Sequence, residues 1–379
     1  MRFVLFAYLI IYSISSQAQS IVTGAEQVDK YLPMLQAKRV GIVCNHSSRI
    51  GNTLLVDSLL KLHVNIVKIF APEHGFRGEA EAGEYVASGK DLQTGLPIIS
   101  LYGKNKKPST QDLSDVNVLL FDIQDVGVRF YTYISTLHYV MESAAENNKP
   151  LIVLDRPNPL GYYVDGPVLD TAYRSFVGMH PVPIVHGMTI GEYAQMINGE
   201  KWLKNNVQCS LTVIPCSLYR HNTRYVLPVK PSPNLIDMTS VYLYPSLCLF
   251  EGTVISVGRG TAYPFQVCGH PLLKGKYSFS FTPKAKLGNK TLLYDAKPCY
   301  GLDLRQHIDS TFTLKYLLEM YHHYPYKKEF FNSFFIKLIG NKKVYDAIKA
   351  EKSEVEIRSL WTDEVNAFMQ IRKKYLLYD

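Results

Sequence analysis

An acid, an imidazole and a guanidinium stand together in the glycine-rich stretch KIFAPEHGFRGEAEAGE, residues 68–84. An apolar run that is typical of a buried strand ends at Pro72 and is followed by Glu73, His74 and Arg77. A glutamic acid held by a strand and shielded by apolar neighbours can keep its proton near neutral pH, because desolvation raises a carboxyl pKa. Glycoside hydrolysis needs such a general acid at the leaving oxygen.

Further carboxylates follow other apolar runs. Asp122 ends the strand pattern of the run VNVLLFDI, Asp125 enters the turn that follows it, and Glu251 lies in LFEGT. Asp125 can orient a catalytic group, bind a substrate hydroxyl or cap the following helix. Paired carboxylates beside arginines and aromatic rings suit glycoside hydrolysis. We therefore predict Glu73 as the general acid, and His74, Asp122 and Asp125 as the other catalytic residues.

The candidates for substrate binding can hydrogen bond to a sugar, pair with its charge or stack on its ring. They are Asn45, Arg77, Gln124, Arg129, Tyr131, Tyr133, Arg156, Asn158, Asn234, Glu251, Arg259 and Tyr263. Arg259 stands between two glycines that let the backbone approach a ligand, which makes it a natural partner for a substrate carboxylate. Arg156 can equally form a local ion pair with Asp155 that shapes the turn.

Motifs of other enzyme classes are missing. The sequence has neither a G-x-G-x-x-G stretch after the first apolar run nor a G-x-x-x-x-G-K-[ST] loop, so no nucleotide cofactor is predicted. H-E-x-x-H and G-x-S-x-G are also absent, which disfavours common zinc hydrolases and serine hydrolases. We predict no cofactor and no metal. Metal-assisted hydrolysis by His46, His74 and Asp122 stays open as an alternative.

Apolar runs that alternate with helical patterns must position these residues. Strands are predicted at 39–44, 65–71, 96–102, 116–123 and 150–154, and helices at 53–62 and 133–147. This alternation predicts an α/β fold with a Rossmann-like, mostly parallel sheet and helices on both faces. In such a sheet the carboxyl ends of the strands share one edge. Four polar clusters follow four of the predicted strands, which predicts a single cleft.

The chain divides into three parts. Residues 1–18 read as a signal peptide, with Arg2, a short apolar core and a small-x-small site ending at Ala18. Residues 19–230 form the predicted Rossmann-like catalytic domain. Residues 231–379 are predicted to form a smaller α+β domain that completes the cleft and ends in helices. In the first domain, Thr189 followed by Glu192 is a capping box, which predicts a structural role for Glu192.

Composition limits the partners. The formal charge of +8 is spread along the chain, without the dense basic stripe of nucleic acid readers, so no nucleic acid is predicted. No later stretch is apolar enough to span a bilayer, so no stable membrane insertion is expected, and the signal peptide predicts a periplasmic location. Six cysteines allow one or two disulfides there, with buried thiols as the simpler alternative. The oligomeric state stays open.

Six motifs in order, APEHGFRG, FDIQDVGVRFYTY, LDRPNPLGYYVDGP, HGMTIGE, PSPN and LFEGTVISVGRGTAYPF, span residues 71–265. Through them the chain resembles the DUF1343 family, whose characterised members are exo-β-N-acetylmuramidases of the NamZ type. The resemblance implies release of N-acetylmuramic acid from the non-reducing end of peptidoglycan fragments. It implies a lactyl carboxylate in the substrate, for which Arg129 and Arg259 are the candidate cations, and Tyr131, Tyr133 or Tyr263 as a stacking surface.

Two other hypotheses remain beside the exo-muramidase. One is a non-catalytic protein that binds peptidoglycan fragments in the same cleft, and the other is the metal-assisted hydrolase. Within the glycosidase hypothesis, inversion and retention of configuration depend on the carboxylate separation, and the N-acetyl group of the substrate can itself act as nucleophile.

Overall fold

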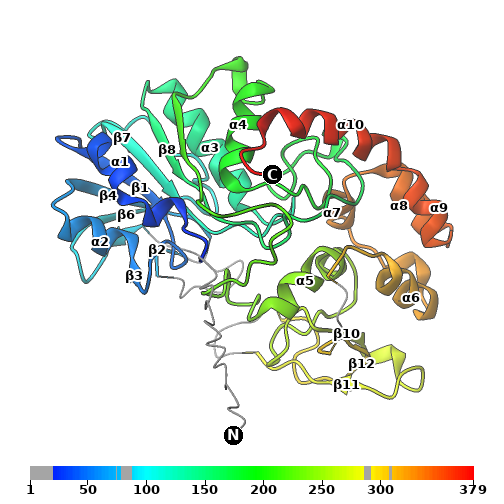
Figure 1. Ribbon diagram of the computed structural model, residues 1–379. Coiled ribbons are helices and arrows are strands. Elements are labelled where there is room, and N and C mark those ends of the chain that lie inside the picture. Colours follow the sequence, from blue (N-terminus) through cyan, green and yellow to red (C-terminus); the bar gives the residue numbers. More distant parts are fainter. Residues whose placement is uncertain (1–19, 74, 78–87, 286–291, 307–309) are drawn as a thin grey trace, which may run out of the picture.

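The computed structural model describes residues 20–73, 75–77, 88–285, 292–306 and 310–379 (Figure 1). The predicted signal peptide and His74 lie outside these residues, as do Glu79, Glu81 and Glu84. No helix in the described part of the chain is long and apolar enough to cross a membrane.

A seven-stranded sheet forms the centre of the N-terminal part. Its strands are β1 (Val40–Cys44), β4 (Ile66–Ala71), β5 (Gly89–Lys90), β6 (Pro97–Ser100), β7 (Val118–Asp122), β8 (Leu151–Leu154) and β9 (Leu211–Ile214). Their order is β5-β6-β4-β1-β7-β8-β9, and all neighbours pair in parallel except β5 with β6. Without β5, this is the order of a Rossmann fold, whose reversal point lies between β1 and β7. The predicted α/β class and all five predicted strands are confirmed.

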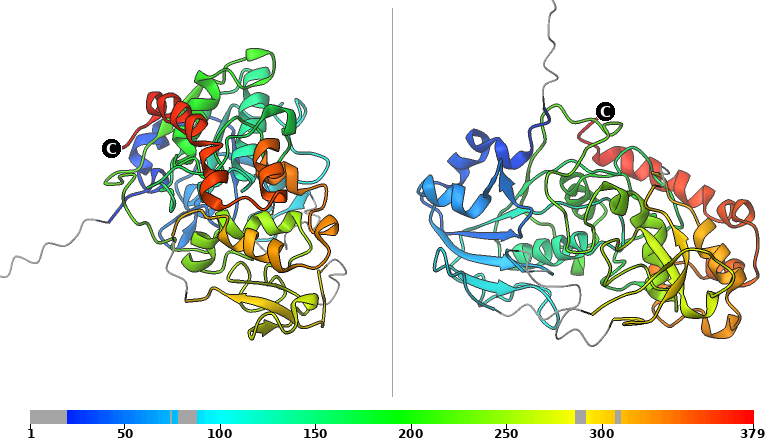
Figure 2. Two further views of the ribbon diagram at one scale, coloured as in Figure 1. Left: turned by 90° about the vertical axis from the view of Figure 1, so that its right-hand side faces the viewer. Right: turned by 90° about the horizontal axis from the view of Figure 1, so that it is seen from below.

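Helices cover both faces of this sheet (Figures 1 and 2). The helices of this part are α1 (Val28–Leu35), α2 (Leu55–Lys61), α3 (Tyr133–Glu146) and α4 (Ile190–Gly199). Residues of α1 and α2 share one apolar core with Val40 and Ile42, and residues of α3 and α4 share the other with Val43. Because neighbouring strand residues point to opposite faces, each buried strand supplies both cores.

The C-terminal part carries a smaller antiparallel sheet and a run of helices. The sheet has the order β10-β12-β11, and a separate hairpin pairs β2 with β3. The remaining strands are β2 (Arg49–Ile50), β3 (Thr53–Leu54), β10 (Val267–His270), β11 (Ser280–Phe281) and β12 (Cys299–Asp303). The remaining helices are α5 (Met238–Leu247), α6 (Lys315–His323), α7 (Phe335–Ile339), α8 (Lys342–Lys349), α9 (Glu354–Ser359) and α10 (Thr362–Arg372). The predicted C-terminal helices are therefore present.

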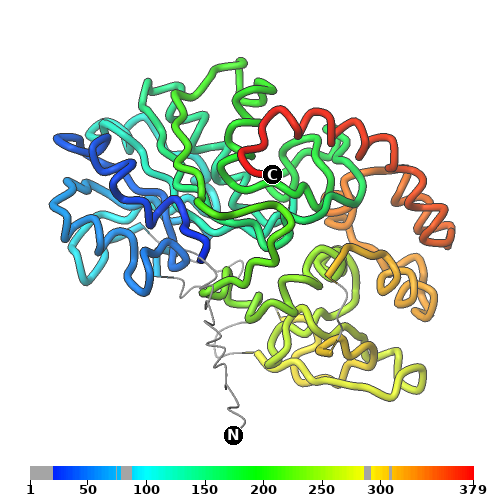
Figure 3. The backbone as a smooth tube through the Cα atoms, in the orientation of Figure 1, coloured from blue at the N-terminus to red at the C-terminus, as the bar shows by residue number. Residues whose placement is uncertain are grey.

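After α10 the chain returns to the N-terminal part and ends beside it (Figure 3). The hydroxyl of Tyr378 donates to Asp155 Oδ2 over 2.5 Å, and the backbone N–H of Leu377 donates to Glu192 Oε1 over 2.8 Å. Glu192 also closes the predicted capping box with Thr189, which confirms its structural role. The final segment thus supplies partners to two carboxylates that are fully buried.

All six cysteines are buried thiols, and none forms a disulfide. Burial raises the pKa of Cys216, which is typical of an unreactive structural thiol.

Candidate active site

A cavity of about 770 Å³ lies where the N-terminal and C-terminal parts of the chain meet. Six of the predicted site residues line it, namely Glu73, Tyr131, Tyr133, Asn234, Glu251 and Arg259. The first three belong to the N-terminal part and the last two follow α5. A pocket of this size and mixed lining suits a ligand of a few sugar rings or less.

Glu73 stands at the end of β4, where Pro72 ends the buried strand. Its side chain is half-buried and its Oε2 accepts a hydrogen bond from the Thr132 hydroxyl over 3.3 Å. Thr132 is the residue before α3 and also lines the cavity. The carboxyl group is therefore held by a core strand and by the start of a helix while it faces the cavity.

Tyr131 and Tyr133 form an aromatic wall beside Glu73. Their rings meet edge to face with centroids 4.9 Å apart. The Tyr131 hydroxyl donates to the Pro231 carbonyl over 2.8 Å, and the Tyr133 hydroxyl accepts from Asn45 Nδ2 over 2.9 Å. Burial raises the pKa of both phenols, so they stay neutral. The protein thus satisfies their polar ends, and their rings supply apolar surface.

Glu251 and Arg259 form an ion pair on the other part of the lining. Arg259 Nε and Nη2 each lie 2.7 Å from Glu251 Oε1, and the Cys248 thiol lies 3.6 Å from Oε2. Gly258 and Gly260, with φ of 76° and 79°, form the turn that presents Arg259. Both charged side chains keep a little more than a quarter of their surface exposed. The pair is therefore available to a ligand.

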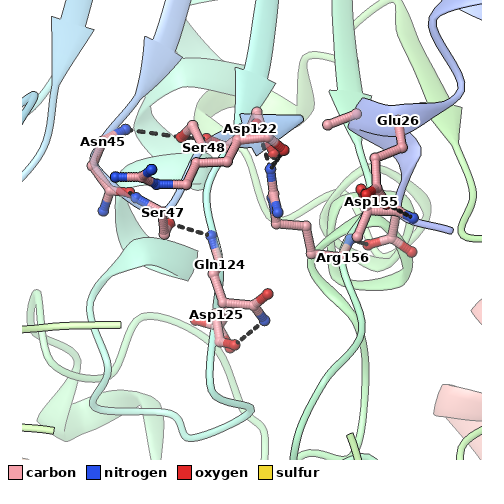
Figure 4. A network of polar contacts seen from close by, with 12 residues as sticks. Glu26, Asn45, Ser47, Ser48, Asp122, Gln124, Asp125, Asp155 and Arg156 are labelled. Carbon is pink, nitrogen blue, oxygen red and sulfur yellow. Dashed lines mark hydrogen bonds and ion pairs between the residues drawn. The ribbon is translucent and has the colours of Figure 1, made fainter. Parts of the chain in front are cut away.

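Asp122 is a correction to the predicted catalytic set, because it is fully buried. Its Oδ1 and Oδ2 accept from Arg156 Nε over 2.5 Å and Nη2 over 2.8 Å (Figure 4). Burial raises the pKa of Asp122, although the charge of Arg156 opposes this rise. Burial alone would lower the pKa of Arg156, but the Asp122 carboxylate raises it. This buried pair ties β7 to the end of β8. Arg156 therefore pairs with Asp122 instead of Asp155 and does not serve a ligand.

Asn45 and Gln124 belong to the same network (Figure 4). Asn45 Oδ1 accepts from the Ser47 hydroxyl over 2.6 Å, whose oxygen accepts from the Gln124 backbone N–H over 3.1 Å. Gln124 Nε2 donates to the carbonyls of Asp125 and Pro157, each over 2.8 Å. These groups fill the place between β1 and β7 where a Rossmann fold binds its dinucleotide. Asn45 reaches the cavity only indirectly, as the support of Tyr133.

Asp125 and Asn158 are also buried away from the cavity lining. Asp125 Oδ2 accepts from the Gly127 backbone N–H over 2.6 Å, and Thr132, not Asp125, occupies the N-cap position of α3. Burial raises the pKa of Asp125 to about 7, against this hydrogen bond. Asn158 donates to the Met188 carbonyl over 2.9 Å and accepts from the Leu160 backbone N–H over 2.8 Å. Both side chains shape loops.

Arg129 is wrong as a candidate for the substrate carboxylate, since its side chain is fully buried. Nη1 donates to the carbonyls of Pro167 and Val182, and Nη2 donates to those of Leu338 and Ile339, over 2.7–2.9 Å. Burial lowers the pKa of Arg129 to about 9. Its guanidinium group joins the loops of the N-terminal part to α7.

Two further candidates lie outside the cavity lining. Arg77 pairs with Asp91 through Nε–Oδ1 and Nη2–Oδ2 contacts of 2.8 Å each. Tyr263 is 40% exposed, and the Arg305 guanidinium lies 4.5 Å from its ring centroid. Tyr263 nevertheless stands between Ala262 and Pro264, which both line the cavity.

The metal alternative draws no support from the described residues, which contain no group of three or more His, Cys, Asp or Glu side chains able to hold an ion. Its three residues are not all described, because His74 lies outside the described part. Asp122 is bound to Arg156, and His46 Nε2 lies 2.8 Å from the Lys230 carbonyl.

Thr132 and Lys284 are among the cavity residues that the sequence alone did not indicate. Thr132, the donor to Glu73, lies in the motif FYTY, where the aromatic residues are the more evident candidates for sugar binding. Lys284 lies in a stretch without any motif, and only the fold brings it to the cavity.

A Rossmann-like sheet joined to a second part across a cavity of carboxylates, an arginine and aromatic rings is an arrangement expected of a carbohydrate-processing hydrolase. Comparisons with known proteins narrow this class. The models "Exo-beta-N-acetylmuramidase NamZ, N-terminal" and "Exo-beta-N-acetylmuramidase NamZ, C-terminal" match residues 40–239 and 242–378. The chain therefore belongs to the NamZ exo-β-N-acetylmuramidase family.

Individual relatives agree. Peptidoglycan beta-N-acetylmuramidase NamZ of Bacillus subtilis (strain 168) is 39% identical, over 96% of this chain and 93% of that protein. Two crystal structures of DUF1343 family proteins from Bacteroides fragilis NCTC 9343 align with TM-scores of 0.88 and 0.81, at 46% and 29% identity. Each alignment covers 95% of this chain and 99% of the other. The resemblance to the DUF1343 family and the predicted fold are both confirmed.

Proposed function

We propose that the protein is an exo-acting glycoside hydrolase that releases N-acetylmuramic acid from the non-reducing end of peptidoglycan fragments. Family membership supports the reaction class and the substrate. The observation that carries the proposal for this chain is the placement of Glu73, a carboxyl group fixed by β4 and Thr132 on the wall of the cavity.

In this proposal Glu73 donates its proton to the glycosidic oxygen as the bond to C1 breaks, and the remaining glycan leaves as an alcohol. The oxygen of a water molecule ends on C1, and the proton that this water releases restores the Glu73 acid. General acid catalysis of this kind contributes on the order of 10²–10⁴ in rate. The rings of Tyr131 and Tyr133 contact an apolar sugar face, while Glu251, Arg259 and Asn234 bind polar groups of the sugar. Asp122 and Asp125 are buried outside the cavity lining and do not touch the substrate.

A chromogenic β-N-acetylmuramic acid glycoside tests the proposal. We expect turnover by the wild type and a loss of at least about 100-fold in kcat for Glu73→Gln, which keeps the size of the side chain but cannot donate an acidic proton. Glu329 is exposed and lies outside the cavity lining, so Glu329→Gln is the matched control and should keep full activity. Undiminished turnover by Glu73→Gln would remove Glu73 from its role.

A protein that only binds peptidoglycan fragments predicts a different outcome of the same experiment. It would retain the glycan without releasing product in either variant. Isothermal titration with a muramyl disaccharide separates the two cases, because binding without release by the wild type would favour the binding function.

We also propose that the protein acts outside the cytoplasm, in the periplasm. The support is the N-terminal sequence, with Arg2, an apolar core and the small residues that end at Ala18. N-terminal sequencing of the protein from a periplasmic fraction should start at Gln19. Recovery of the intact N-terminus from the cytoplasm alone would contradict this location.

A further inference from the structure

The proposed substrate carries a carboxylate on its lactyl group, which a cation at the cavity can bind. Two of the described residues that line the cavity are cations, Arg259 and Lys284. Arg129 is buried elsewhere, where its guanidinium group donates to four backbone carbonyls. Arg156 is also buried elsewhere, where it pairs with the Asp122 carboxylate.

Arg259 has its charge matched within the protein. Two of its nitrogens lie 2.7 Å from the same oxygen of Glu251, so an approaching carboxylate meets an ion pair instead of an unopposed cation. The Coulomb attraction of a neutral pair for an anion falls off quickly with distance. Arg259 can donate a hydrogen bond to a sugar, but it is a poor discriminator between charged and uncharged substrates.

Lys284 differs in this respect. Its side chain is exposed and its ammonium group forms no ion pair with a described residue. Its backbone is anchored, since its N–H donates to the Gly260 carbonyl over 2.9 Å. A Cβ atom on Gly260 would lie 2.9 Å from the Lys284 carbonyl oxygen, so the glycine permits this contact. The turn that presents Arg259 thus also holds Lys284 at the cavity.

Lys284 also approaches the cavity from a different part of the chain than Glu73. Lys284 follows β11 in the C-terminal part, and Glu73 follows β4 in the central sheet. A general acid acts at C1 of the sugar, whereas the lactyl group is attached at C3, across the ring. A cation close to a general acid would favour loss of its proton, so a separate support for the carboxylate suits the chemistry.

We propose that Lys284 binds the lactyl carboxylate of the terminal N-acetylmuramic acid and thereby sets the preference of the enzyme for this sugar. The inference rests on the proposed function, and it names the group that recognises the charge of the substrate. The flexible stem of lysine lets the ammonium group follow the carboxylate, and a charge-assisted hydrogen bond joins the two.

Two chromogenic glycosides test the proposal, β-N-acetylmuramic acid and its neutral lactyl amide. For Lys284→Met we expect kcat/KM on the acid to fall about 10- to 100-fold, the range of one charge-assisted hydrogen bond, mostly through KM. The value for the amide should stay within about twofold of the wild type. Lys284→Arg should restore most of the activity on the acid, and Lys276→Met, an exposed lysine outside the cavity lining, should change neither value.

Three results would overturn the proposal. In the first, Lys284→Met keeps the wild-type preference for the acid over the amide. In the second, activity on both substrates falls equally, which indicates a structural role. In the third, the variant loses activity on a glycoside whose lactyl group is already linked to a dipeptide, so that Lys284 recognises a peptide carboxylate instead. Absence of turnover by the wild type on every substrate would instead contradict the proposed function, which keeps the two failures distinct.

Discussion

The guanidinium group of Arg156 binds both oxygens of the Asp122 carboxylate at the carboxyl end of the central sheet, with contacts of 2.5 and 2.8 Å. Neither side chain is more than 5% exposed. Asp122 and Arg156 both belong to conspicuous sequence motifs. Their polar side chains hold the ends of two neighbouring strands together.

Asp122→Asn should destabilise the protein without a specific effect on substrate binding. The change leaves the buried Arg156 charge without its carboxylate, which costs about 3–5 kcal/mol in other buried pairs. Chemical denaturation measures the loss. Asp346→Asn breaks the exposed pair with Lys342 and serves as control, with an expected cost of at most about 1 kcal/mol. Equal stability of the two variants would contradict the structural role of Asp122.

Arg129→Lys should likewise lower stability while the remaining folded enzyme keeps its KM. A lysine cannot donate to four carbonyl groups in the fixed planar arrangement of a guanidinium, so several acceptors become unsatisfied at about 1–3 kcal/mol each. Thermal unfolding and steady-state kinetics check the two halves of this prediction. A stable Arg129→Lys variant with a strongly raised KM would instead indicate that Arg129 binds the substrate.

Asp125→Asn should flatten the pH dependence of stability between pH 5 and 7. The folded-state pKa of Asp125 is raised to about 7 from an ordinary value near 4, so the folded protein binds the extra proton between these values. The free energy of unfolding of the wild type therefore decreases through this group as pH rises towards 7. Removing the titration should lessen the decrease by on the order of 2 kcal/mol.

Urea denaturation at several pH values measures this difference. His186 Nε2 lies 3.9 Å from Asp125 Oδ2 and has a pKa lowered by burial to about 3. The titration of His186 changes the free energy of unfolding in the opposite direction to that of Asp125. Because His186 is present in both the wild type and Asp125→Asn, its contribution largely cancels in the comparison. Parallel pH profiles of the two proteins would show that Asp125 does not titrate in this range.

Tyr378→Phe should destabilise the protein by about 1–3 kcal/mol, because a buried carboxylate and a backbone N–H both lose a partner. The hydroxyl donates to Asp155 and accepts from the Cys216 N–H over 2.8 Å. Burial raises the pKa of Asp155 to about 6 and the Tyr378 hydroxyl opposes the rise. Because the ionised Asp155 carboxylate depends most on the Tyr378 hydroxyl, the loss of stability in Tyr378→Phe should be larger at pH 8 than at pH 5.

Tyr375→Phe is the matched control for Tyr378→Phe. The Tyr375 hydroxyl donates to Glu200, and its side chain is only partly buried, so its loss should cost less. Thermal unfolding of both variants at the two pH values makes the comparison. If Tyr375→Phe proves the more damaging change, the final segment is held mainly by its surface contacts.

The strands and main helices could be predicted from the sequence because their pattern is local. Alternate residues of β7 belong to opposite apolar cores, and a continuous apolar run is the direct result. The capping box of α4 is equally local, with Thr189 and Glu192 three residues apart. Such features depend on neighbours in the chain, which a single sequence displays.

The roles of the polar residues could not be predicted in the same way. Glu73 and Asp122 both end buried strands, but only the packing of other segments decides which side chain faces the cavity and which is enclosed. The acceptors of Arg129 come from residues 167, 182, 338 and 339, whose proximity depends on the whole fold.

The docking of residues 377–379 onto the N-terminal part sets an order of events during synthesis. His221, whose backbone N–H donates to the Asp379 carbonyl, leaves the ribosome more than 150 residues before its acceptor. Asp155 and Glu192 must wait as long for Tyr378 and Leu377. The Rossmann-like part therefore cannot complete these buried contacts until residues 377–379 have also left the ribosome.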